Sequence, residues 1–191
     1  HVMEDLEGRI AMVLDSGPVG IGIESTIIDL TVMPPQILRP GYITKEMLEK
    51  VLGQVETDRA LIAPDSGIVP KAPGMKYRHY APGGELVIVE GTSEAVAEYV
   101  NEHVDADRKA GEKTGVICTA ESVDKYRAHV VKNVGSRSDE ESIARNLFLV
   151  LREFDDEKVT RIYSESFSDQ GLGQAIMNRL LKAAGYRVVK V

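Results

Sequence analysis

The sequence lacks tryptophan, holds a single cysteine, Cys118, and contains no apolar run near the ~18 residues that a membrane-spanning helix requires. A lone cysteine cannot form a disulfide within the chain, and no signal-peptide pattern occurs at the amino end. Both absences are typical of a cytoplasmic protein with no membrane contact, which is what we expect. Cys118 lies in an apolar run, so we interpret it as a buried thiol without chemistry.

A broad basic surface is also lacking, because the net charge is −7. Residues 1–59 hold 5 basic and 10 acidic side chains, residues 60–84 hold 3 and 1, and residues 85–191 hold 15 and 19. The one basic stretch is short and is flanked by acidic regions. This distribution argues against direct RNA binding, which needs an extended cationic face.

Proline is absent after Pro82, whereas residues 60–84 contain four prolines and four glycines without helix or strand periodicity. A structureless stretch of this length is typical of an interdomain segment or a functional lid. We therefore predict an amino-terminal unit over residues 1–59, a linker over 60–84 and a second domain over 85–191.

Residues 85–191 alternate between strand-like apolar runs and stretches with helical spacing of apolar residues. Predicted strands are 86–89, 115–119, 130–134, 161–164 and 187–191, and predicted helices lie near 93–104, 121–127, 139–154 and 171–184. Repeated βα units imply a mainly parallel sheet covered on both faces. The predicted fold is α/β, a Rossmann-like three-layer domain.

Residues 1–59 offer fewer elements. Strands are predicted over 9–14, 26–31 and 36–39, and a helix is predicted between Thr44, a good N-cap, and Gly53, a good C-terminal cap. These pieces leave too little surface for a core of normal size. We interpret them as an incomplete α+β catalytic-domain fragment whose beginning is absent.

Two side chains in this fragment could bind a polar substrate. Ser25 opens a predicted strand beside a glycine-rich turn, although a serine in such a place is more often an ordinary turn residue. Arg39 precedes Pro40-Gly41, which stiffens the strand end and suits an arginine that binds phosphate, although a surface ion pair is the commoner role.

The linker concentrates charge and aromatic side chains between prolines, in residues 72–82. In an extended segment Tyr77 would face one way, and Lys76, Arg78 and Tyr80 the other. Stacking surfaces beside cations suit a nucleotide, since the base needs the first and the phosphates the second.

Three motifs follow one another along the chain: Gly-Ile-Glu-Ser-Thr-Ile-Ile-Asp at 22–29, Ile-Leu-Arg-Pro-Gly at 37–41 and Pro-Gly-Met-Lys-Tyr-Arg-His-Tyr-Ala-Pro at 73–82. Their order resembles that of two-domain L-threonylcarbamoyladenylate synthases of the YrdC/YwlC family. Gly-Leu-Gly-Gln-Ala-Ile-Met-Asn-Arg-Leu at 171–180 is similar to the last helix of their accessory domain. The likeness covers nearly the whole chain, which corresponds to the carboxy-terminal portion of these enzymes.

The resemblance implies an enzyme that joins L-threonine, bicarbonate and ATP into threonylcarbamoyl-AMP and pyrophosphate, an intermediate for tRNA threonylcarbamoyladenosine. By motif, Ser25 would contact threonine and Arg39 the ATP phosphates. Positioning and charge neutralisation dominate such a reaction, so we assign no catalytic acid-base residue and no protein metal ligand, and we expect Mg²⁺ to accompany ATP. The product would pass to the tRNA threonylcarbamoyl transferase machinery.

The same resemblance implies that Tyr77 or Tyr80 reaches the nucleotide as the linker folds over the site, with Lys76 and Arg78 beside the phosphates. The family's Lys-x-Arg and Ser-Pro-Thr segments do not occur in this chain, so we expect it to be inactive alone. The alternative is that residues 85–191 form a stand-alone nucleotide- or protein-binding module.

Overall fold

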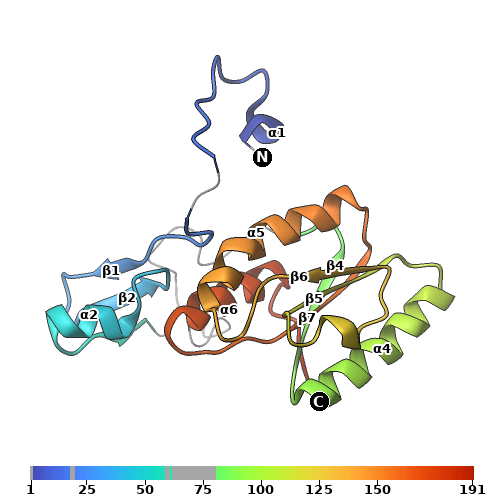
Figure 1. The fold of residues 1–191 in the computed structure, drawn as a ribbon. Helices are drawn as coiled ribbons and strands as arrows, with labels where there is room; N and C mark the ends of the chain where they lie inside the picture. The colour runs from blue at the N-terminus through green and yellow to red at the C-terminus, as the bar shows by residue number, and fades with distance from the viewer. Residues whose placement is uncertain (1, 18–19, 59–60, 62–80) are drawn as a thin grey trace.

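The computed structural model describes residues 2–17, 20–58, 61 and 81–191. Two β-sheets organise these residues, a small one near the amino end and a larger one that fills the second half of the chain (Figure 1). The predicted linker tyrosines and cations, at positions 76–80, lie outside the described residues.

The small sheet has three short strands in the order β1-β2-β3, which are Ile27–Asp29, Gln36–Arg39 and Glu56–Thr57. β1 and β2 are antiparallel, and β2 and β3 are parallel. β1 ends where the Asp29 carboxylate accepts hydrogen bonds from the backbone N–H and the hydroxyl of Thr31, at 2.9 and 2.6 Å. The buried apolar core under this sheet is small, with Ile37 and Val55 each 1% exposed.

The predicted strand over residues 9–14 is wrong. The amino end instead begins with a short helix, α1 (Val2–Leu6), and residues 9–14 form neither helix nor strand. Met12 and Leu14 are 76% and 90% exposed, so the apolar pattern of this segment covers no core in the described structure. A strand needs a hydrogen-bonded neighbour, and no described strand pairs with this segment.

The helix predicted between Thr44 and Gly53 is confirmed as α2 (Lys45–Leu52). The Thr44 hydroxyl accepts a hydrogen bond from the Met47 N–H, and Gly53 adopts a positive φ of 77° just after the last turn. Both are the capping interactions that stop a helix from fraying. None of the residues of α2 is buried, and Val51 is 83% exposed.

The larger sheet has five parallel strands in the order β6-β5-β7-β4-β8. This arrangement confirms the predicted α/β class with a parallel sheet flanked by helices. The strands are β4 (Glu85–Glu90), β5 (Thr114–Cys118), β6 (Val130–Asn133), β7 (Arg161–Glu165) and β8 (Val188–Lys190). The helices are α4 (Ser93–Lys109), α5 (Glu140–Asp156) and α6 (Gly171–Ala183), with a 3-10 turn, η1, at Val123–Lys125.

Helices cover both faces of this sheet, α4 on one and α5 with α6 on the other (Figure 1). Successive strand side chains point to opposite faces, so Ile88 packs with the α5 and α6 cluster and Val89 with the α4 cluster. Gly115 lies where a Cβ would come 2.5 Å from the Phe154 ring, which shows how closely α5 approaches β5. The rigid layer that results positions the carboxyl ends of the strands and the outer surface of α5 and α6.

No helix in the described part of the chain is both long and apolar enough to cross a bilayer. The division into residues 1–59, 60–84 and 85–191 stays a prediction, because most of the predicted linker lies outside the described residues.

Candidate functional site

The structure brings together the two predicted site residues of the amino-terminal fragment. The Arg39 guanidinium donates from Nε to the Ser25 carbonyl at 3.0 Å and from an Nη to the Ser25 hydroxyl at 3.2 Å. Ser25 is exposed and Arg39 half-buried, so both remain accessible to a solute. A hydroxyl and a guanidinium in contact can bind a polar substrate and an anion side by side.

Strand pairing explains this contact. Arg39 ends β2 opposite Ile27, the first residue of β1, and Ser25 lies two residues before Ile27. The turn that follows is packed against the same segment, because a Cβ on Gly41 would lie 2.3 Å from the Glu24 carbonyl oxygen. Glycine at 41 therefore lets the Pro-Gly turn close over the chain beside Ser25.

Sequence reasoning missed two cations of the last helix, Arg179 and Lys182, which are 6% and 5% exposed. Burial lowers the pKa of the Lys182 ammonium; neighbouring Glu24 raises it, and Arg39 lowers it further. The charge of Arg39 therefore contributes to the electrostatic environment of Lys182. The helix sequence itself offered no clear signal, because a cation between apolar residues of a helix usually marks an exposed position.

Tyr77, Tyr80, Lys76 and Arg78 were predicted to reach the nucleotide, and they lie outside the described residues. Their assignment stays a prediction.

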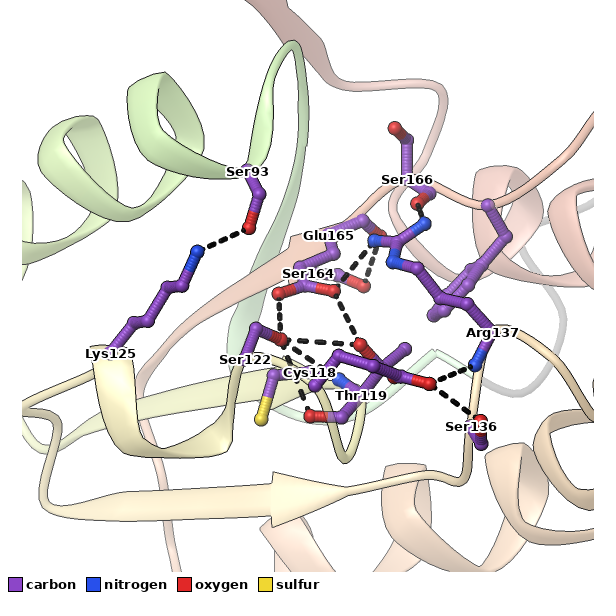
Figure 2. A network of polar contacts seen from close by, with 12 residues as sticks. Ser93, Cys118, Thr119, Ser122, Lys125, Ser136, Arg137, Ser164, Glu165 and Ser166 are labelled. Carbon is purple, nitrogen blue, oxygen red and sulfur yellow. Dashed lines mark hydrogen bonds and ion pairs between the residues drawn. The ribbon is translucent and has the colours of Figure 1, made fainter.

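A second polar cluster surrounds Glu165 at the carboxyl end of β7 (Figure 2). Its carboxylate is 4% exposed and accepts hydrogen bonds from Tyr126 at 2.7 Å, Thr119 at 3.3 Å and Ser122. Arg137 completes the set with an ion pair at 2.7 Å. Burial, and then the bond to Glu165, raise the pKa of the Tyr126 hydroxyl strongly.

This Glu165 cluster is saturated with donors, as a buried carboxylate must be. A cavity of about 260 Å³ adjoins it, between the start of α4 and the half-exposed Arg137 side chain. The geometry suits a structural clamp that ties β7 to the loops after β5 and β6. Sequence analysis did not single out Glu165, although its place at the carboxyl end of a buried strand was a usable signal.

Among the described residues no group of three or more histidine, cysteine, aspartate or glutamate side chains could hold a metal ion.

Comparison with known proteins gives two family matches. Residues 43–185 match the family described as "Threonylcarbamoyl-AMP synthase, C-terminal domain", and residues 1–41 match the one described as "Telomere recombination". The chain is 46% identical over 190 residues to the threonylcarbamoyl-AMP synthase of Bacillus subtilis, and 44% identical over 191 residues to that of Pyrococcus abyssi.

Each of these alignments covers 100% of this chain, which spans about half the length of the curated relatives it matches, 53% and 54%. A solved structure, "Crystal structure of P. abyssi Sua5 complexed with L-threonine", matches the whole chain with a TM-score of 0.88 at 43% identity, over 54% of its own length. Another, of a P. abyssi Sua5 variant with a histidine and a tyrosine replaced by alanine, matches with a TM-score of 0.89 at 42% identity, over 53% of its length.

Proposed function

The chain belongs to the threonylcarbamoyl-AMP synthase family, and we propose that it is part of an enzyme forming threonylcarbamoyl-AMP and pyrophosphate from L-threonine, bicarbonate and ATP. The observation that carries the proposal is the contact between Ser25 and Arg39, the residues that the family resemblance assigns to threonine and ATP phosphates. A relative's structure with bound L-threonine supports the substrate class.

The proposed reaction balances without a redox partner. The threonine amine condenses with bicarbonate to a carbamate, with loss of water. A carbamate oxygen then attacks the α-phosphorus of ATP, and the bond to the β-phosphate oxygen breaks as pyrophosphate leaves. Downstream, transfer of the threonylcarbamoyl group to a tRNA adenosine would release AMP, and we place both steps in the cytoplasm.

The residues of this chain would act by positioning and by charge. Ser25 would donate or accept a hydrogen bond with threonine, while Arg39 would neutralise charge on the ATP phosphates as pyrophosphate departs. Tyr77 or Tyr80 would stack on the nucleotide, with Lys76 and Arg78 near the phosphates. Mg²⁺ would enter with ATP, held by its phosphates.

The experiment measures pyrophosphate release by the enzyme at the full length of its relatives, with threonine, bicarbonate and ATP each omitted in turn. Release should require all three. Arg39→Ala should raise the KM for ATP about ten- to a hundredfold, the usual cost of losing a charge-assisted contact. Tyr77→Ala should raise the same KM because it removes the proposed stacking contact, and Ser25→Ala should raise the KM for threonine instead. Release that is independent of threonine, or unchanged KM values in all three variants, would refute the assignment.

A further inference from the structure

The backbone just before Ser25 lies directly on the helices of the second domain. A Cβ placed on Gly22 would come within 2.4 Å of the Arg145 carbonyl oxygen and 2.5 Å of the Ala144 carbonyl oxygen, both on α5. Ile23 packs against the apolar cluster beneath α5 and α6. Only a residue without a side chain allows this approach at position 22.

One buried arginine of α6 fastens the same segment. An Nη of Arg179 donates a hydrogen bond to the Gly22 carbonyl and lies 4.0 Å from the Glu24 carboxylate. The Arg179 guanidinium also lies 4.8 Å from the centre of the Phe148 ring of α5, and the residue is 6% exposed. Arg179 thus extends from α6, lies against Phe148 of α5 and binds the Gly22 carbonyl of the amino-terminal segment. These contacts fix the position of its guanidinium.

Ser25 follows Glu24 directly, and its own carbonyl and hydroxyl are bound by Arg39 from the other side. The position of Ser25 therefore depends on two arginines, one on β2 and one on α6. The likeness to the P. abyssi structures extends over 100% of the chain at a TM-score of 0.89, so both parts of the chain are arranged as in that relative.

We propose that Arg179 is a positioning residue for the threonine site, and that α5 and α6 of the second domain form the wall against which the Gly22–Ser25 segment is set. This assigns the second domain a direct part in threonine binding, and it rests on the proposed role of Ser25. A shift of ~1 Å in a binding group can cost about a hundredfold in rate, so the contact has a measurable consequence.

The test uses the enzyme at the full length of its relatives and compares Arg179→Gln with Arg179→Lys and Gly22→Ala. Arg179→Gln should raise the KM for threonine about tenfold, as expected when a buried charged donor is lost, while the KM for ATP changes by less than about threefold. Arg179→Lys keeps the charge and one donor, so it should recover part of the threonine affinity. Gly22→Ala should mimic Arg179→Gln without removing any charge.

A matched control is Arg187→Gln, because Arg187 is an exposed arginine of the same domain that pairs with Glu85. This control should leave both KM values unchanged. Circular dichroism and a thermal melt identify any variant that fails to fold, and Gly22→Ala keeps the proposal testable if Arg179→Gln is such a variant.

The outcomes separate the two proposals. If the unmodified enzyme releases no pyrophosphate, or if Ser25→Ala leaves the KM for threonine unchanged, the proposed function or its site fails. If Ser25→Ala raises that KM while folded Arg179→Gln and Gly22→Ala do not, the positioning role is overturned. A rise in the KM for ATP equal to that for threonine would also overturn it.

Discussion

Replacing Glu165 by alanine should destabilise the fold around the five-stranded sheet by about 2–5 kcal/mol, a large share of the roughly 5–15 kcal/mol that stabilises a typical protein. The Glu165 carboxylate accepts from three hydroxyls and one guanidinium inside a nearly solvent-free pocket. A buried polar group that loses its partner costs about 1–3 kcal/mol. The Tyr126 hydroxyl should dominate, because Thr119 and Ser122 also hydrogen-bond each other.

The Arg137 side chain should contribute less to this loss, since it is 48% exposed and water can solvate the freed guanidinium. The assay is urea unfolding followed by circular dichroism, with Tyr126→Phe and the double variant completing a thermodynamic cycle. We expect a coupling energy of about 1 kcal/mol or more between Glu165 and Tyr126.

The matched control is Glu90→Ala, which removes an ion pair to Lys190 whose side chains are 48% and 77% exposed. It should change stability by less than about 0.5–1 kcal/mol. A Glu165→Ala effect no larger than that of Glu90→Ala, or strict additivity with Tyr126→Phe, would refute the clamp.

Burial, and then Glu165, raise the pKa of the Cys118 thiol from 9.0 to about 12, and Cys118 is 0% exposed. The folded chain should therefore not react with Ellman's reagent at pH 8 although the unfolded chain does, and fast reaction of the native thiol would contradict this. Between pH 9 and 12 the Cys118 thiol loses its proton in the unfolded state but keeps it in the folded state. The protonated thiol therefore contributes fully to the free energy of unfolding below pH 9, and this contribution should fall by up to about 1.4 kcal/mol per pH unit above it. Cys118→Ala should remove this slope. Gly115→Ala should cost about 1–3 kcal/mol in urea unfolding by forcing Phe154 aside, whereas Gly20→Ala, with open space around it, should be neutral; equal effects would exclude the packing argument. The 191-residue chain alone should release no pyrophosphate, because Arg39, Lys76 and Arg78 must balance about four negative charges on ATP without the family's Lys-x-Arg segment. Turnover comparable to that of the longer enzyme would show that the site is misplaced.

Features set by neighbouring residues could be predicted from the sequence. The α2 boundaries follow from Thr44 and Gly53, whose capping roles depend on contacts three or four residues away. The βα alternation of residues 85–191 likewise follows from local periodicity. The strand predicted over 9–14 failed because a strand is stabilised by a partner that may lie anywhere in the chain, and periodicity does not identify one.

The contacts around the site could be predicted only in part. Arg39 ends β2, and Ser25 lies two residues before β1, the strand that pairs with β2; the motif resemblance pointed to both residues. Arg179 contacts Gly22 across 157 positions, and its burial depends on that docking, which leaves no mark in the composition of the helix. Glu165 could have been found from its place at the end of a buried strand, but its partners come from the loops after β5 and β6, which are distant from it in the sequence.

The most direct test of the central claim follows the carbon of bicarbonate. The enzyme at the full length of its relatives is incubated with ¹³C-bicarbonate, L-threonine and ATP, and the nucleotide products are analysed by mass spectrometry. The account predicts threonylcarbamoyl-AMP carrying one ¹³C, formed in equal amount to pyrophosphate and lost in Ser25→Ala and Arg39→Ala at low substrate concentration. Pyrophosphate release without a labelled threonine adduct of AMP would contradict it.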